Sequence, residues 1–420
     1  MAGTVHVLGA GLAGLAAALT LSAEGRKVIV HEAANKAGGR CRSYHDPLLN
    51  RVIDNGNHLM MSANDHVFAW LDDIGARSRV AVTDPAAYPF VNVETGERWT
   101  VRPNRGPIPW WIFVPSRRVR GARIRDFLEG IRLLRADPEK TVADCLSQDT
   151  MLWRRFWEPL TVGALNCAPH EGAAALLAEV HRRTFAKGEA FSRPVFVKES
   201  LADALIDPAI ALLERRGVQV RLRSRVRALQ YDSDRLNGFA TTREEIVLHT
   251  DDRVIMALPS WVAAELMPEI GPPSGARMIL NLHFLLDGKP DLPPVTGLTG
   301  SIAQWLFIKG EVASVTVSAA DPFAETPADD ISARIWPEIA VALGTPGAPQ
   351  PPCRVVKEKR ATFLQTPANE KRRPGAVTHW SNLFLAGDWT DTGLPATIEG
   401  ALQSGRTAAA SAMAQSGGPS

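Results

Sequence analysis

The first 32 residues place two apolar runs around a glycine-rich turn, and this arrangement restricts the fold more than any other feature. Residues 5–8 and 27–31 are β-branched and apolar, which is typical of buried strands. Between them lie Gly-x-Gly-x-x-Gly at residues 9–14 and an Ala/Leu-rich stretch that predicts a helix to about residue 23. A strand, a glycine turn, a helix, a strand and then an acid form the context that a dinucleotide fingerprint requires.

The three glycines of the turn have separate roles in such a fingerprint. Gly9 allows a tight turn, Gly11 lets the backbone approach a pyrophosphate, and Gly14 lets the helix pack on the strand. The N–H groups and the dipole of the helix N-terminus favour the phosphate charge. Glu32 lies 18 residues after Gly14, where a carboxylate can accept the hydroxyls of an adenosine ribose. The residues that we expect to bind the cofactor here are Gly9, Ala10, Gly11, Leu12, Ala13, Gly14, Glu32 and Ala33.

The long apolar run at residues 5–23 resembles a membrane span or a signal peptide only superficially. Three glycines interrupt it and no basic segment precedes it, so we interpret it as a strand and a helix. The 420 residues carry 47 Lys and Arg against 45 Asp and Glu, a balance that argues against a nucleic-acid binder. Four cysteines without a Cys-x-x-Cys pair predict neither a disulfide framework nor a metal site, and indicate a cytoplasmic protein.

A second motif follows the acid after five residues. Gly38-Gly39-Arg40 completes a pattern that resembles the amine oxidase and phytoene desaturase superfamily of FAD proteins. Two glycines let the chain return close to the diphosphate, and Arg40 supplies a cation there. The resemblance implies that Gly39 and Arg40 bind FAD and that the next segment passes beside the isoalloxazine. The residues of that segment are Asn55, Gly56, Asn57 and His58.

The C-terminal region carries the second FAD signature of this superfamily. Ala-Gly-Asp at residues 386–388 ends an apolar run, and Pro-Ala-Thr-Ile-Glu-Gly-Ala follows at residues 395–401. The resemblance implies that Gly387 and Asp388 reach the ribityl–phosphate region of FAD. It also implies that a helix starting near Thr397 points its N–H groups at the flavin, with Ala396 and Ile398 beside it. No cysteine lies within thirty residues, so we expect non-covalent FAD.

Residues 221–227 alternate between arginine and smaller or apolar residues, which predicts a strand. In the resembled superfamily the valine of such a strand presents its backbone to the adenine, and Val226 takes that position. A half-exposed strand without a ligand is the alternative. Residues 253–259 resemble the strand that closes this half of the FAD-binding domain.

We therefore expect an α/β fold in which a discontinuous Rossmann-like FAD-binding domain is interleaved with an α+β substrate domain. The FAD-binding domain would consist of residues 1–75, 196–262 and 355–420. The substrate domain would consist of residues 76–195 and 263–354, with sheet strands at 278–284 and 301–307.

Two departures disfavour amine oxidation. Thr397 stands where amine oxidases of this superfamily place an aromatic residue, and no lysine occurs between Lys198 and Lys289. The chain is most similar to the squalene-associated FAD-dependent desaturases, also called hydroxysqualene dehydroxylases. The matching stretches are residues 38–44, 53–59, 157–160, 164–166 and 386–390.

The resemblance implies reductive removal of a hydroxyl from hydroxysqualene, which gives squalene for hopanoid synthesis. No second dinucleotide fingerprint is visible, so an external electron donor is expected. Asp54 and His58 are candidates for an acid or for flavin-positioning roles, and a purely structural role is their alternative. An oxidative carotenoid-type desaturase, an amine oxidase and a non-catalytic flavoprotein partner stay open as other functions.

An apolar isoprenoid substrate implies a route from the bilayer, and residues 107–135 suit one. Apolar aromatics at 110–113 precede a predicted helix at 123–135 with Ile124, Phe127, Leu128, Ile131 and Leu134 on one face. Nine arginines between residues 101 and 135 face two acids, a net charge of +7. This pattern favours peripheral contact with the cytoplasmic membrane. A core helix with a solvated basic face is the alternative.

Overall fold

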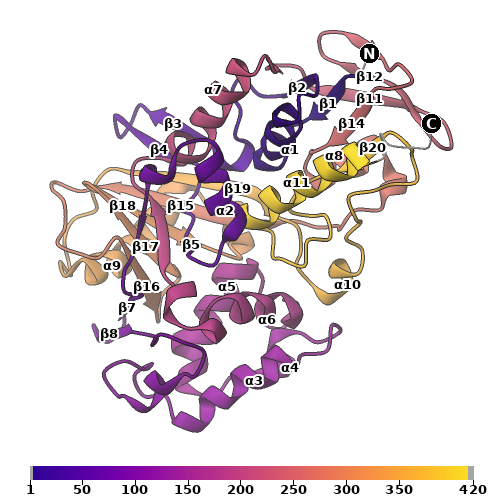
Figure 1. Ribbon diagram of the computed structural model, residues 1–420. Coiled ribbons are helices and arrows are strands. Elements are labelled where there is room, and N and C mark those ends of the chain that lie inside the picture. The colour runs from indigo at the N-terminus through magenta and orange to yellow at the C-terminus, as the bar shows by residue number, and fades with distance from the viewer. Residues whose placement is uncertain (1–2, 415–420) are drawn as a thin grey trace.

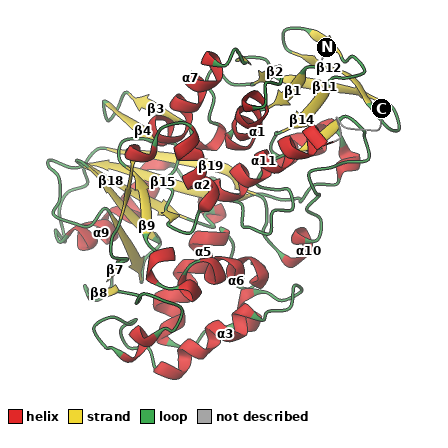
Figure 2. Ribbon diagram, in the orientation of Figure 1, coloured by secondary structure: helices red, strands yellow, loops and turns green. Residues whose placement is uncertain are grey.

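The computed structural model describes residues 3–414. The C-terminal residues 416–420, which we expect to be frayed, lie outside the described range. Figure 1 shows that helix α1 (Leu12–Ala23) and the C-terminal helix α11 (Ile398–Ala414) pack side by side at one end of the molecule. Figure 2 shows the helices of residues 129–183 gathered at the opposite end. The first and last parts of the chain therefore build one body together.

The predicted strand–helix–strand unit is confirmed and belongs to a parallel five-stranded sheet. The strands, in spatial order, are β10 (Gln219–Arg221), β2 (Val28–His31), β1 (Val5–Leu8), β14 (Arg253–Met256) and β20 (Leu383–Leu385). All neighbouring pairs are parallel, and the buried side chains of β1 and β2 pack against α1 and α11. Parallel strands that are buried on both faces have nearly continuous apolar sequences, and this pattern allowed β1 and β2 to be predicted.

The prediction of one strand over residues 221–227 is wrong, because the chain leaves one sheet and enters another within these residues. β10 ends at Arg221, and β11 begins an antiparallel three-stranded sheet. Its strands are β11 (Val226–Tyr231), β12 (Leu236–Thr241) and β13 (Glu245–Val247). Arg223 has a left-handed backbone (φ 56°), and the N–H of Ser224 donates to the carbonyl of Glu32 at 2.7 Å. This turn wraps the chain around the end of β2.

A mixed seven-stranded sheet forms the centre of the second body. Its strands, in spatial order, are β19 (Cys353–Thr362), β15 (Arg277–Leu285), β18 (Val312–Val317), β17 (Trp305–Lys309), β16 (Val295–Thr299), β7 (Tyr88–Asn92) and β8 (Arg98–Val101). Leu280 and Leu282 of β15 pack against helix α9 (Ala328–Leu343). Asn281 and His283 alternate with them and therefore lie on the other face. This polar face is directed at the FAD-binding half of the molecule.

The predicted strand at 278–284 is confirmed, and the one at 301–307 begins only at Trp305. Ser301 and Ile302 form a turn in which the Ser301 hydroxyl and the Ile302 N–H both donate to Glu338, at 2.6 and 2.9 Å. A half-buried carboxylate acceptor on α9 thus competes with strand pairing at this position.

Two smaller sheets connect the two bodies. A hairpin consists of β3 (Ser43–Asp46) and β4 (Arg51–Asp54), and a three-stranded sheet consists of β5 (Met60–Met61), β9 (Pro194–Val197) and β6 (Val80–Val82). The other α-helices are α2 (Asp65–Asp73), α3 (Glu129–Leu134), α4 (Val142–Cys145), α5 (Glu158–Leu165), α6 (Ala174–Arg183), α7 (Asp207–Arg215), α8 (Ser260–Leu266) and α10 (Pro367–Glu370).

The predicted interleaved α/β architecture is confirmed, whereas the segment bounds stay a prediction. β19 crosses the bound at residue 355 and belongs to the seven-stranded sheet, so β20 carries the return to the five-stranded sheet. The helix predicted at residues 123–135 is divided into a 3₁₀ turn at Ile124–Leu128 and the short helix α3. Within residues 3–414, no helix combines the length and the apolar character needed to cross a membrane.

Candidate cofactor site and active site

The glycine turn after β1 has the shape that a dinucleotide phosphate requires. Gly9 has a φ of 106°, and a Cβ on Gly14 would lie 1.9 Å from the Gly9 carbonyl oxygen. Only glycine is tolerated at these two positions. Gly11 differs, because a Cβ there would meet no protein atom within 4 Å. The turn is therefore closed towards the strand and open at Gly11, where the N-terminus of α1 can receive an anion. Leu12 and Ala13 begin this helix.

Glu32 lies at the end of β2, as the fingerprint predicts, and it also stabilises the turn. Its Oε2 accepts the N–H of Ala10 at 2.8 Å, and its Oε1 accepts the N–H of Ala34 at 2.7 Å. Each carboxylate oxygen keeps a second lone pair for a ribose hydroxyl. The N–H of Ala10, which we expect among the cofactor contacts, is used within the protein. Ala33 is exposed beside Glu32.

An ion pair joins the two predicted FAD motifs. Arg40 Nη2 lies 2.7 Å from Asp388 Oδ1, and Arg40 Nη1 donates to the Ala361 carbonyl at 2.7 Å. Asp388 is only 5% exposed, whereas the Arg40 side chain is 35% exposed, so the aspartate is shielded from water and the arginine is partly open to it. The sequence predicted Arg40 as a cation for the diphosphate. In the structure Asp388 already balances its charge, and Gly39 places the arginine with a left-handed turn (φ 56°).

The second signature positions the N-terminus of α11. Gly387 has a φ of 143°, and its N–H donates to the Ser404 hydroxyl at 2.9 Å. The Thr397 hydroxyl accepts the N–H of Gly400 at 3.3 Å and so caps the helix. Ile398 and Glu399 lie in the first turn of α11. No carbonyl within the helix can accept their N–H groups, which therefore point out of the helix end. Ala396 is predicted to contact FAD, but its N–H is used within the protein, where it donates to Gln365 Oε1 at 2.7 Å.

Sequence reasoning missed two side chains that hold this signature in place. Gln365 is fully buried and links Ala396 to the carbonyl of Leu165, to which its Nε2 donates at 2.6 Å. The Arg373 guanidinium is also buried and donates to the carbonyls of Thr390, Leu394 and Asp388. Arg373 stands in a run of four charged residues, which predicts an exposed turn, so no local signal distinguished it.

Asp54 is held by three hydrogen-bond donors from different parts of the chain. Its carboxylate accepts the Ser43 hydroxyl at 2.6 Å, the N–H of Leu201 at 2.8 Å and the Lys309 ammonium at 2.6 Å. The carboxylate is 4% exposed. These contacts favour the structural alternative for Asp54 over a proton donor. The catalytic hypothesis stays a prediction, and Lys309 was not anticipated.

His58 has a half-buried imidazole that makes no hydrogen bond with any residue between 3 and 414. Burial lowers its pKa to about 4, although the charge of Asp54 acts in the opposite direction. The side chain is therefore neutral at pH 7. His58 can donate a hydrogen bond from one ring nitrogen, but it carries no additional proton to give.

The loop between β4 and β5 lies on the polar face of the seven-stranded sheet. Asn55 Nδ2 donates to Glu358 of β19 at 2.9 Å, and Asn57 Nδ2 donates to Thr316 of β18 at 3.1 Å. Gly56 lies over Asn281 of β15. Three of the four residues predicted to pass beside the flavin, Asn55, Gly56 and Asn57, thus contact the seven-stranded sheet.

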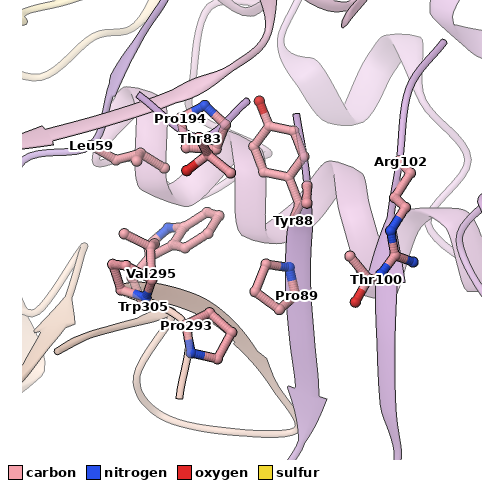
Figure 3. Close-up of a pocket in the computed structure, with 12 residues that line it drawn as sticks. Leu59, Thr83, Tyr88, Pro89, Thr100, Arg102, Pro194, Pro293, Val295 and Trp305 are labelled. Atoms are coloured by element: carbon pink, nitrogen blue, oxygen red, sulfur yellow. The ribbon is translucent and has the colours of Figure 1, made fainter. Parts of the chain in front are cut away.

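A pocket opens next to this loop, at the edge of the same sheet (Figure 3). Its volume is about 170 Å³. The lining is mostly apolar and consists of Leu59, Thr83, Ala87, Tyr88, Pro89, Thr100, Arg102, Pro194, Pro293, Pro294, Val295 and Trp305. Figure 3 shows Tyr88 and Pro89 on β7 across from Val295 and Trp305. Leu59 directly follows His58, so the pocket adjoins the loop.

Val226 begins β11, pairs with Thr241 and is buried beside Leu8 and Met256. The turn at residues 222–225 brings this strand start next to Glu32. This places Val226 on the side of the sheet where the ribose is expected. Its contact with adenine stays a prediction.

The comparisons with known proteins agree with this geometry. The sequence model of the family described as flavin containing amine oxidoreductase matches residues 12–413, and the chain belongs to this family of FAD-dependent oxidoreductases. Within it, the chain is 40% identical to the hydroxysqualene dehydroxylase of Zymomonas mobilis, over 98% of this chain and 99% of the relative. It is 41% identical to the enzyme of that name from Rhodopseudomonas palustris, over 97% and 98%. The chain therefore belongs with the hydroxysqualene dehydroxylases.

The fold is shared more widely. Cyclohexylamine oxidase from Brevibacterium oxydans superposes with a TM-score of 0.66 over 99% of both chains, at 15% identity. The predicted fold class, the FAD cofactor and the oxidoreductase class are confirmed.

Proposed function

We propose that this protein removes the hydroxyl group of hydroxysqualene and releases squalene. The observation that carries the proposal is the identity of 40–41% to proteins named for this activity, over at least 97% of the chain. The mostly apolar pocket beside the loop at 55–58 suits an isoprenoid chain. β15 carries Asn281 and His283 on the face towards this loop and no lysine, which continues to disfavour amine oxidation.

The reaction replaces a C–O bond with a C–H bond and releases water. Bound FAD, in its two-electron reduced and fully protonated form, would supply the hydride, and the second proton of that form balances the water that is released. The protein would hold the cofactor with the open turn at Gly11, the carboxylate of Glu32 and the N-terminus of α11. The prolines and aromatic rings of the pocket would exclude water from the carbon that loses its hydroxyl. His58 is neutral at pH 7, so it would orient the leaving hydroxyl by donating a hydrogen bond.

The test is an anaerobic incubation of the holoenzyme with hydroxysqualene after chemical reduction of its FAD. We expect one squalene per flavin in a single turnover, and repeated turnover when a reductant is supplied, because the electron donor is proposed to be external. Oxidised holoenzyme is the control and should give none. Desaturation of a polyene by oxidised enzyme, without squalene from reduced enzyme, would establish the oxidative alternative. Anaerobic bleaching of the flavin by an amine would indicate an amine oxidase.

We further propose that residues 107–135 bind the cytoplasmic face of the membrane. Large apolar side chains are exposed throughout this segment, which we call the apolar-basic surface. They are Ile108 (75% exposed), Phe113 (63%), Leu128 (61%), Ile131 (50%), Trp110 (47%) and Ile124 (42%). The two acids of the segment, Asp126 and Glu129, are buried, so the exposed charges within residues 107–135 are arginines. Apolar side chains among cations suit an anionic lipid surface.

The exposure of these side chains argues against the alternative of a core helix. Of the five apolar residues predicted on one helix face, Ile124, Leu128 and Ile131 lie in solvent. Leu133 is buried in their place, because the chain changes from a 3₁₀ turn to α3 at Glu129 and the face rotates. The surface follows β8, whose neighbour Arg102 lines the pocket, so bound lipid would lie near the pocket.

Vesicle binding tests the apolar-basic surface directly. Holoenzyme should sediment with vesicles that contain phosphatidylglycerol and much less with pure phosphatidylcholine, and added salt should weaken the binding. The double variant Phe113→Ala, Leu128→Ala should bind at least tenfold more weakly. Val247→Ala is the matched control, because Val247 is 74% exposed on β13, outside this segment. Equal binding of both variants, or no binding of the unmodified protein, would refute the proposal.

A further inference from the structure

We propose that Asn281 is a positioning residue that sets the place of the loop at residues 55–57 within the cofactor site. Asn281 lies in the middle of β15, and its side chain is 1% exposed. Its Nδ2 donates to the Asn55 carbonyl at 3.3 Å, and its Oδ1 accepts the N–H of Asn57 at 3.3 Å. One side-chain amide thus binds the loop backbone on both sides of Gly56, as a strand neighbour would.

The space between the loop and the strand fits this clamp closely. A Cβ on Gly56 would lie 3.2 Å from Asn281 Nδ2, closer than an ordinary van der Waals contact, so a side chain there would press on the amide. Glycine at residue 56 therefore lets the amide approach the loop without being displaced.

Thr316 fixes the orientation of the Asn281 amide. It lies directly opposite Asn281 in the β15–β18 register, and its hydroxyl donates to Asn281 Oδ1 at 3.0 Å. The same hydroxyl oxygen accepts Asn57 Nδ2 at 3.1 Å. A hydroxyl that donates to Oδ1 leaves Nδ2 directed at the Asn55 carbonyl, which is the arrangement the clamp needs.

The clamp connects the two interleaved bodies at the predicted flavin contact. The loop follows β4 of the FAD-binding half, whereas Asn281 and Thr316 belong to the seven-stranded sheet. The ion pair of Lys309 with Asp54, at the end of β4, and the bond from Asn55 to Glu358 both use side chains. Asn281 instead binds the main chain of the loop at Asn55 and Asn57, so it controls where the backbone at Gly56 lies. This inference depends on the FAD cofactor and not on the identity of the substrate.

The test compares Asn281→Leu with Ser314→Ala in the purified holoenzyme. Leucine has a similar volume but makes neither hydrogen bond to the loop. Ser314 is the matched control, because its hydroxyl binds His283 at 2.7 Å in the next cross-strand pair of the same face. Three properties are measured without substrate: the dissociation constant of FAD, the visible absorption spectrum of the bound flavin and its reduction potential.

We expect Asn281→Leu to weaken FAD binding about tenfold and to shift both the flavin spectrum and the potential. Ser314→Ala should leave all three unchanged, even if both variants melt earlier than the unmodified protein. Asn281→Asp provides a second variant if leucine prevents folding; it keeps the acceptor for Asn57, loses the donor to Asn55 and should shift the same properties. Unchanged flavin properties in the Asn281 variants, or equal shifts in Ser314→Ala, would overturn the proposal.

Discussion

Replacing Gly11 with alanine is expected to leave the chain folded and to weaken FAD binding at least 100-fold. The new Cβ would meet no protein atom within 4 Å, and Gly11 has a φ of −74°, which alanine adopts without strain. The methyl group would instead stand at the open N-terminus of α1. A phosphate must approach this backbone closely, so the steric cost falls on the bound state alone.

Gly14→Ala is the matched control for this prediction. Its Cβ would lie 1.9 Å from the Gly9 carbonyl oxygen, so this variant should lose stability as well as FAD. The measurements are urea unfolding of the apoprotein and titration of apoprotein with FAD. Gly11→Ala should unfold at the urea concentration of the unmodified apoprotein. A Gly11→Ala variant that binds FAD normally would show that the phosphates lie elsewhere.

The protein is expected to lose about 6 kcal/mol of unfolding free energy between pH 6.5 and pH 4 through two buried histidines. His6 on β1 and His31 on β2 are hydrogen-bonded at 3.2 Å, and both lie against Phe239. Burial lowers the pKa of His6 to about 4 and that of His31 to about 3. The folded state therefore holds fewer protons than the unfolded state in this range. The stabilisation is complete above pH 6.5 and is lost as the pH falls towards the folded pKa values.

Urea unfolding at several pH values between 8 and 4 measures this effect. His31→Phe should be less stable at pH 8, because it leaves the His6 and Ser224 side chains without this partner. Its decline between pH 6.5 and 4 should nevertheless be smaller than that of the unmodified protein. His249→Gln, at an exposed position, should follow the unmodified protein. An equal decline in His31→Phe would assign the acid sensitivity to other groups.

The sequence was most informative where structure depends on local pattern. The strands β1, β2, β14 and β20 and the helix α1 are mostly apolar runs, and all were predicted close to their observed bounds. The alternating run at residues 221–227 predicted one continuous strand wrongly, because its period of two is also the period of a strand. The hydrogen bond from Ser224 to the Glu32 carbonyl, which breaks that strand, depends on residues 192 positions apart.

The candidate site was predictable only in its glycine and acid motifs. The three donors to Asp54 come from β3, the start of a helical segment and β17, and no local pattern connects them. Gln365 and Asn281 act through buried amides, which have no charge or periodic signal in a sequence. Arg373 has the charge but stands among exposed charged residues. These positions acquire their roles from contacts between distant segments.

The ion pair between Arg40 and Asp388 joins residues 348 positions apart in the sequence. During synthesis the glycine turn, Glu32 and Arg40 leave the ribosome long before Asp388, β20 and α11. For most of translation Arg40 therefore has no carboxylate partner from the second signature, and the five-stranded sheet lacks its last strand. We therefore expect FAD to bind only after β20, Asp388 and the N-terminus of α11 have been synthesised, because a chain that ends before residue 383 has neither Asp388 nor these two elements.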